Sequence, residues 1–299
     1  MAAVDYARPL TPSGNLRRRR TVDRVMRGAA TFAAFLAVAI LVAFIYAIVQ
    51  RGASVISFSF LTENPSTSFG FHTPTGGIAN AIIGTALIVG VATVIALPLG
   101  VLIAIFLTEY ATPRWASPVR LALDLLYGLP SIVIALFIYG LLVYGHTQSG
   151  LAASLALAMI MLPLIARTTG ESLALVPREL RDASFALGIS RWRTTAGITV
   201  PSALGGIITG TVLAVARAAG ETAPVLILSN LANPTTTSAS VFSQPLNNIP
   251  YDIFNFSEEG GPTNIAKAWG CALVLVAFVL IANLVARLLQ ARSRRMTSR

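Results

Sequence analysis

The 299-residue chain has little charge, one cysteine and two histidines, and each shortage excludes a class of protein or site. Charged residues make up 11% of the chain. Soluble domains average about 25%, so this chain lacks the polar side chains of an ordinary water-facing surface. Cys271 stands alone, which excludes an intrachain disulfide. His72 and His146 are too few for a zinc or haem constellation and fall in predicted loops, so we expect no metal site.

The chain also has a single lysine, which argues against ATP binding of the usual kind. A phosphate-cradling Walker loop requires Gly-Lys-Ser/Thr. Lys267 follows an alanine, so no such loop is present. We therefore expect no cofactor and no enzyme activity in this chain, and we expect any driving ATP and Mg²⁺ to be bound by a separate partner.

Long apolar blocks are what the sequence does contain, and hydrophobic residues make up 55% of it. Blocks of about 20 apolar residues match the roughly 30 Å of hydrocarbon in a bilayer. The sequence therefore predicts an all-α integral membrane protein with about six transmembrane helices. The predicted blocks are Gly28–Gln50, Gly77–Leu107, Val119–Tyr144, Leu151–Ala166, Ser202–Leu231 and Ala266–Leu289. The first is longer than a secretory signal core and lacks a small-residue cleavage site, which favours an uncleaved anchor.

The basic residues predict how these helices are oriented. If the N-terminus is inside, 19 of the 22 basic residues lie in segments on the cytoplasmic side, as the positive-inside rule requires. We therefore expect a basic cytoplasmic tail at 1–27, a six-helix membrane domain at 28–289 with a cytoplasmic loop at 167–201, and a second basic tail at 290–299. The arginines at 17–20 have no interleaved aromatic residues, so we expect a topological role and no nucleic-acid partner.

The cytoplasmic loop has the pattern of a short helix that ends in a sharp turn. Pro177 suits the first turn of a helix, where its missing N–H costs nothing. Leu180, Ala183 and Leu187 then recur at helical spacing and predict a small apolar face. Gly188 can end the helix because glycine accepts the left-handed conformation found just past helix ends.

A second short helix is predicted directly after this turn. Ser190 can cap a helix that contains Trp192, and Pro201 is expected to introduce the fifth membrane helix. Periodicity alone leaves two interpretations open. The hairpin transmits force from a cytoplasmic partner, or it is an amphipathic interfacial element without a partner.

The spacing within this loop resembles a known family. Asp182-Ala183-Ser184, three residues, Gly188, nine residues and then Ile198-Thr199-Val200-Pro201 resembles the EAA loop of ABC importer permeases. The departures are Asp for Glu, Ser for Ala and Val for Leu. The resemblance implies a type I ABC importer (MetI-like) permease fold. It also implies that Asp182, Ala183, Ser184, Gly188 and Pro201 belong to coupling helices that dock on an ATPase subunit.

Two charged residues interrupt the fifth apolar block. Arg217 and Glu221 are four residues apart, which allows them to pair on one helix face. An arginine near mid-membrane costs about 2.5–3.5 kcal/mol on insertion scales, so it usually faces a cavity or a partner. Either the pair only locks helices together, or Arg217 supplies positive charge to a permeating anion. The adjoining stripe of small residues predicts close helix approach: Gly206, Gly210, Ala214 and Ala218.

The segment from Arg217 to Pro224 also resembles the fifth-helix motif of phosphate permeases, the PstA type. Arg167, followed by Thr168-Thr169-Gly170-Glu171, stands where that family has another basic residue near the cytoplasmic mouth. The resemblance implies phosphate import with Arg217, Glu221 and Arg167 on or near the path. For Arg167, an ordinary positive-inside anchor stays open as the alternative. Asp124 is interpreted as structural.

The resemblance further implies partners and a location. The partners are a second, homologous permease subunit in a heterodimer, a dimer of ATPase subunits and an extracytoplasmic phosphate-binding protein. The expected location is the bacterial cytoplasmic membrane, with a multi-pass chain and both termini inside. Two alternatives stand beside phosphate import. One is an ABC permease for another oxyanion, sulfate or molybdate. The other is an ion-coupled secondary transporter, which leaves the Asp182–Pro201 spacing unexplained.

Overall fold

The computed structural model describes residues 16–65, 76–229 and 244–297. The chain divides into two compact units, 1–50 and 51–299, and each is described by itself. His72, the end of the fifth predicted block and the first part of the N-terminal tail lie outside the described residues. The described residues form helices joined by short connections, with one isolated β-bridge between Pro65 and Gly76.

The described part of the first unit is a single helix. It belongs to α1 (Leu16–Gly52), which is long and apolar enough to cross a membrane. Most of its apolar side chains, Phe32 and Phe35 among them, are exposed. A helix that is hydrophobic all round suits a lipid environment. The preceding turns are basic, and Arg27 pairs with Asp23 at 2.6 Å.

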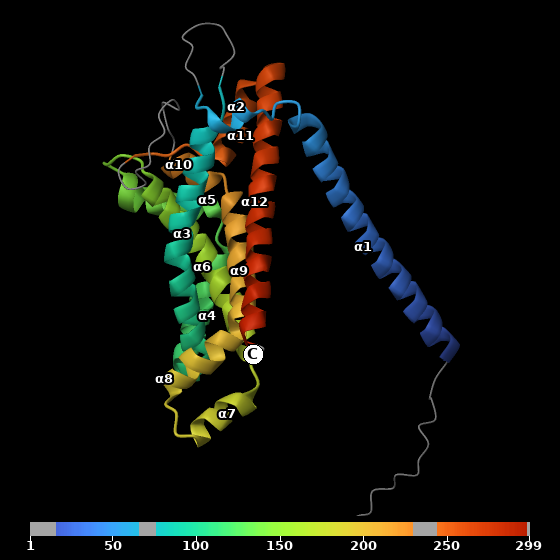
Figure 1. The fold of residues 1–299 in the computed structure, drawn as a ribbon, viewed down its shortest axis with the longest axis vertical. Coiled ribbons are helices and arrows are strands. Elements are labelled where there is room, and N and C mark those ends of the chain that lie inside the picture. Colours follow the sequence, from blue (N-terminus) through green and yellow to red (C-terminus); the bar gives the residue numbers. More distant parts are fainter. Residues whose placement is uncertain (1–15, 66–75, 230–243, 298–299) are drawn as a thin grey trace, which may run out of the picture. The chain divides into compact units, whose positions relative to one another are not determined.

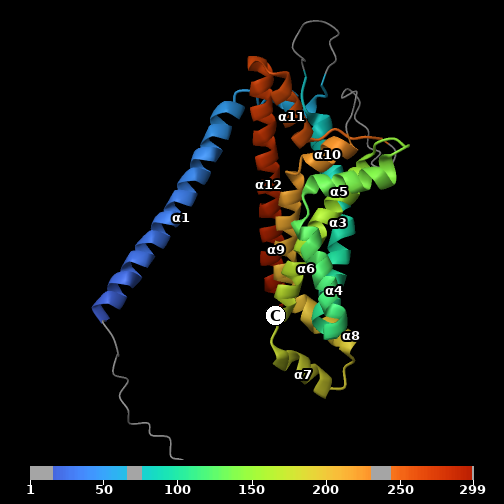
Figure 2. The same cartoon turned by 180° about the vertical axis from the view of Figure 1, so that it is seen from behind.

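Four long membrane helices make up most of the second unit (Figures 1 and 2). They are α3 (Ala79–Ile105), α6 (Gly150–Ala174), α9 (Val200–Ala219) and α12 (Gly261–Thr297). A π-helical turn, η1 (Phe106–Tyr110), extends α3. By length and composition, the described chain has five membrane-crossing helices, or six if the bent pair described next is one crossing.

The predicted crossing Val119–Tyr144 is not one straight helix. It consists of α4 (Pro113–Gly128) and α5 (Ser131–Ile138), and a π-turn, η2 (Tyr139–Val143), follows α5. The helical segments on either side of Leu129–Pro130 are bent by 102°. The cause is local: a residue before proline is disfavoured in the helical region, and Leu129 is extended with ψ 135°.

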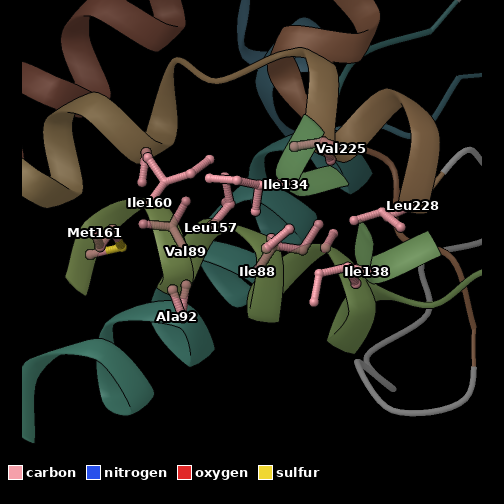
Figure 3. Packing of buried hydrophobic residues seen from close by; sticks show 14 of the residues in the cluster. Ile88, Val89, Ala92, Ile134, Ile138, Leu157, Ile160, Met161, Val225 and Leu228 are labelled. Atoms are coloured by element: carbon pink, nitrogen blue, oxygen red, sulfur yellow. The ribbon is translucent and has the colours of Figure 1, made fainter. Parts of the chain in front are cut away.

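The core of the second unit forms around α6, which packs against α3 and α9. Close packing is possible because α6 presents small residues such as Ala152, Ala153 and Ala156, all buried. At one end of α6, α5 and α10 (Ala223–Leu228) complete the cluster (Figure 3). Its labelled members are Ile88, Val89, Ala92, Ile134, Ile138, Leu157, Ile160, Met161, Val225 and Leu228.

The short helices α7 (Arg178–Ala186) and α8 (Arg191–Thr194) lie at one end of the second unit, and two others, α2 (Phe58–Thr62) and α11 (Ile249–Glu259), lie at the opposite end (Figure 1). Buried polar groups hold α11 in place. The amide of Asn247 donates to both carboxylate oxygens of Asp252, at 3.0 and 3.2 Å. The backbone N–H of Ile249 donates to the hydroxyl of Thr85 on α3 at 2.9 Å. Burial raises the pKa of Asp252 to about 7, so this carboxyl is only partly ionised near neutral pH.

Two glycines of the small-residue stripe lie where α9 crosses α6. A Cβ at Gly206 would meet the side chain of Ser172, and a Cβ at Gly210 would meet that of Thr168. Gly210 is buried. The predicted close approach along this stripe is therefore confirmed.

We expect Gly210→Ala to destabilise the protein. Alanine favours helices by about 1 kcal/mol over glycine, but overpacking a well-packed contact costs about 1–3 kcal/mol. Gly90→Ala is the matched control, because a Cβ added at Gly90, another helical glycine, would meet nothing within 4 Å. Thermal unfolding of the purified protein in detergent should show a lower Tm for Gly210→Ala only. Equal Tm values for the two variants would contradict the close-approach account.

Candidate functional site

A helix–turn–helix projects at one end of the second unit (Figures 1 and 2). Its first helix is α7 (Arg178–Ala186), which begins directly after Pro177. Gly188 has a φ of +74°, which confirms the predicted left-handed turn. The N–H of Gly188 donates to the carbonyl of Phe185 at 2.9 Å, and that of Ile189 donates to Ser184 at 3.2 Å. These bonds satisfy carbonyls at the end of α7.

The predicted coupling residues on α7 have different surroundings. Ser184 is buried, and its hydroxyl lies 2.7 Å from that of Thr194 in α8 (Arg191–Thr194). This hydrogen bond joins the two short helices. Asp182 and Ala183 are not buried, and Ala183 is exposed. Ser184 therefore holds the turn together, while Asp182 and Ala183 are available to a partner.

The second short helix is not separate from the fifth membrane helix. α8 continues through a π-turn, η3 (Thr195–Thr199), into α9, and the whole stretch Arg191–Ala219 is helical. Pro201 lies in the first turn of α9, as expected, but the helical stretch already begins before it, at Arg191. A proline is tolerated within this continuous helical stretch because Pro201 lies in the first turn of α9, directly after the π-turn. α8 and α9 thus form one continuous helical stretch.

The apolar face predicted for α7 points away from the membrane helices. Leu180, Ala183 and Leu187 are all exposed. Leu187 and, on α8, Trp192 are large apolar side chains with 80% and 63% of their surface exposed.

A cavity of about 370 Å³ extends to the end of α6, the helix that precedes α7 in the chain. Residues of α3, η1, α4 and α6 form its wall, and Ala174, the last residue of α6, is among them. Its polar and charged lining residues are Thr108, Arg120, Asp124, Tyr127, Arg167 and Glu171.

Arg167 lines this cavity. Its Nε lies 3.9 Å from Oε1 of Glu171, which is ion-pair range but longer than a hydrogen bond. Both side chains are more than half exposed, at 59% and 70%. Such an exposed pair is held weakly, so the guanidinium of Arg167 can turn to another anion.

Arg217 contacts the wall of this cavity through one of its lining residues, Tyr127. It lies in the last turn of α9, and its guanidinium lies over the ring of Tyr127 with 5.8 Å between the guanidinium carbon and the ring centre. The predicted pair with Glu221 is present, with 3.5 Å between Nε and Oε1. Glu221 follows the end of α9, so the pair joins the helix to the next turn rather than two positions of one helix. Tyr127 thus connects Arg217 with the cavity that Arg167 lines.

Sequence reasoning missed the contribution of α4 to this cavity. Arg120 counted only toward topology, and Asp124 was interpreted as structural, yet both line the cavity with Tyr127. The signal was present, since positions 120, 124 and 127 share one helix face. The cavity wall therefore carries two guanidinium and two carboxylate groups. Guanidinium presents a planar fork of donors that matches two oxygens of an oxyanion.

A helical membrane protein that presents a projecting helix–turn–helix beside a charged cavity has the parts of a transport subunit. The chain belongs to the family of binding-protein-dependent transport system inner membrane components, whose model matches residues 96–295. The match spans both the helix–turn–helix and the cavity. A curated relative, the phosphate transport system permease protein PstA 1 of Mycobacterium tuberculosis (strain CDC 1551 / Oshkosh), is 40% identical over 217 residues, 72% of this chain and 71% of the relative.

Solved structures show the same fold. A chain of a bacterial alginate ABC transporter, in complex with an alginate pentasaccharide-bound periplasmic protein, has a TM-score of 0.62 at 16% identity. The structural match covers 93% of this chain and 99% of the transporter chain. A chain of the MetNI methionine ABC transporter in an inward facing conformation has a TM-score of 0.57 at 17% identity, covering 73% and 94%. The predicted MetI-like permease fold is confirmed.

We expect Gly188→Ala to loosen the helix–turn–helix. A left-handed conformation costs a non-glycine residue about 1–2 kcal/mol, and Gly188 has φ +74°. Gly197→Ala is the matched control, because Gly197 lies in η3 with open space around it and no positive φ. Hydrogen exchange should become faster for the amides of α7 and α8 in Gly188→Ala but not in Gly197→Ala. Unchanged exchange in both variants would refute a glycine-dependent turn.

Proposed function

We propose that this chain is the transmembrane permease subunit of an ATP-driven ABC importer of inorganic phosphate. The observation that carries the proposal is the arginine-lined cavity beside an exposed helix–turn–helix. α7 begins at Arg178, close to Ala174 in the cavity wall, so a partner that moves α7 acts next to the transported ion.

Phosphate fits the chemistry of the cavity. Arg120 and Arg167 line it, and Arg217 contacts its wall through Tyr127. Guanidinium groups recognise phosphate through paired hydrogen bonds that a single ammonium cannot reproduce. The relative that is 40% identical is named a phosphate transport permease, which supports phosphate over sulfate or molybdate.

Energy comes from a separate ATPase that binds ATP and Mg²⁺. The chain has one lysine, Lys267, and no Walker loop around it. The surface formed by Leu180, Asp182, Ala183 and Leu187 is the docking surface for that ATPase. An extracytoplasmic phosphate-binding protein delivers the ion, in keeping with the family's description as binding-protein-dependent.

The chain forms half of the translocation path. Arg167 and Glu171 line the cavity and are still more than half exposed, so the cavity is open in the single subunit. A second, homologous permease subunit in a heterodimer closes that side. A buried path between two subunits also explains why charged side chains are tolerated among membrane helices.

The importer lies in a bacterial cytoplasmic membrane with the helix–turn–helix inside. Arginines gather in α7 and α8 and in the connections at the same end, Arg178, Arg191 and Arg193 among them. Loops rich in arginine usually face the cytoplasm, which supports a cytoplasmic position for both termini. This orientation presents α7 to a cytosolic ATPase.

Reconstitution with co-purified partners tests the function. The complex is placed in liposomes, and ATP hydrolysis is measured with the binding protein loaded with phosphate, sulfate or molybdate. Stimulation by the phosphate-loaded protein alone is expected. Stimulation by the sulfate- or molybdate-loaded protein would assign that oxyanion as the substrate in place of phosphate. Uptake driven by a proton gradient without ATP would establish a secondary transporter instead.

We expect Arg167→Ala and Arg217→Ala each to lower phosphate uptake at least about ten-fold. A hydrogen bond to a charged group contributes about 1.5–3 kcal/mol, and a ten-fold change corresponds to about 1.4 kcal/mol. Arg114→Ala is the matched control, because Arg114 is an exposed arginine outside the cavity lining. Uptake of labelled phosphate is compared at equal amounts of assembled complex. Normal uptake in Arg217→Ala would leave Arg217 a helix-packing residue.

A further inference from the structure

Glu109 is a buried carboxylate that the proposed function does not yet use. It lies in η1, the π-turn at the end of α3, and its side chain is 9% exposed. Nη2 of Arg181 on α7 lies 3.0 Å from Oε1 of Glu109, and the arginine side chain is 17% exposed. The pair therefore connects a coupling helix with a membrane helix at short distance and largely out of water.

Arg181 is bound on its other side as well. Its Nη1 donates to the carbonyl of Val176 at 3.0 Å, and its Nη2 donates to the carbonyl of Leu173 at 2.8 Å. Leu173 lies in the last turn of α6 and Val176 lies just beyond its end, so the guanidinium binds the C-terminal end of this helix. One guanidinium thus joins α7, the end of α6 and η1.

α8 reaches the same turn through a second arginine. Nη2 of Arg191 donates to the backbone carbonyl of Glu109. The guanidinium of Arg191 also lies over the ring of Tyr110, with 5.0 Å between its carbon and the ring centre. We call Glu109 and Tyr110, together with Arg181 and Arg191, the Glu109 clamp.

The turn that the clamp holds is also part of the cavity wall. Leu107 and Thr108, which precede Glu109 in η1, line the cavity. The π-turn closes with the N–H of Ala111 donating to the carbonyl of Phe106 at 2.7 Å. π-turns of this kind are inserted into helices frequently at functional sites.

We propose that the Glu109 clamp passes the movement of the coupling helices to the cavity wall, with Glu109 and Arg181 as positioning residues for transport. The proposal rests on the proposed function, because it needs an ATPase that moves α7 and α8. α8 is continuous with α9, so its movement reaches that helix directly. The clamp supplies the second route, from both short helices to η1 and α3.

Charge-assisted hydrogen bonds suit this task. They are shorter and about twice as strong as neutral ones, so a displacement of α7 is passed on rather than absorbed. Glu109→Gln keeps the acceptor oxygen and removes the charge, whereas Glu109→Ala removes both. The two variants should therefore weaken coupling in steps.

The test uses the complete transporter reconstituted with its ATPase and binding protein. In Glu109→Ala, stimulation of ATP hydrolysis by the phosphate-loaded binding protein should fall about ten-fold, within the usual range of coupling between sites. Glu109→Gln should retain an intermediate stimulation. Basal hydrolysis and co-purification of the ATPase should stay at the wild-type level. Glu258→Ala, an exposed carboxylate on α11, is the control and should match the wild type throughout.

Three results would overturn the proposal. One is wild-type stimulation in Glu109→Ala. Another is an equal loss of basal hydrolysis and stimulation in Glu109→Gln, which shows a structural role only. If Glu109→Ala does not assemble, unchanged stimulation in Glu109→Gln decides against the clamp. Absence of stimulation in the wild type would instead refute the proposed function, so the two failures are distinguishable.

A reporter in the cavity wall measures the movement itself. Thr108→Cys is made in a Cys271→Ala background, which removes the only native thiol. The rate of labelling by a water-soluble thiol reagent should change when ATP is added to the assembled transporter. Glu109→Gln should reduce that change. An ATP response of the same size with and without Glu109→Gln would show that the clamp does not transmit the movement.

Discussion

The guanidinium of Arg181 makes the contacts that hold the helix–turn–helix against the membrane helices. It donates to carbonyls at the end of α6 and to the carboxylate of Glu109 at the end of α3. These groups lie largely out of water, where an unpaired carboxylate or carbonyl costs far more than at a surface. The positions of α7, α6 and η1 are therefore linked. The helix that leads to the turn at Gly188 is held against the membrane helices by these contacts.

Much of the fold could be predicted because a bilayer leaves few solutions. Backbone groups in hydrocarbon must bond within their own segment, so apolar blocks become helices. The approach of α9 to α6 followed from the small residues around Gly206 and Gly210. The break at Leu129–Pro130 was missed because the residues on both sides of it are apolar. Hydropathy shows that a segment is apolar but not whether its helix axis changes direction. The conformational effect of Pro130 on Leu129 was the available signal.

The site was predictable only where its residues are close in sequence. Leu180, Ala183 and Leu187 stand at helical spacing and Gly188 follows them, and this short stretch predicted the helix and the turn that the structure contains. Glu109 and Arg181 are separated by 72 positions. No pattern in the neighbouring sequence distinguishes either residue. Arg181 contributed only to the count of basic residues in the predicted cytoplasmic loop. Pairs of this kind are set by helix packing, which a single sequence does not display.

Hydrogen-bond and ion-pair distances divide three arginines into two kinds. Arg181 is bound tightly, with donor–acceptor distances of 2.8 to 3.0 Å and little exposure of its side chain. Arg167 and Arg217 face glutamates at 3.9 and 3.5 Å and are about half exposed. Contacts that long contribute little, because water screens them and the side chains keep their freedom. Under the proposed function, an oxyanion engages the guanidinium groups of Arg167 and Arg217 without breaking a strong bond, while Arg181 keeps its contacts with Glu109 and the end of α6.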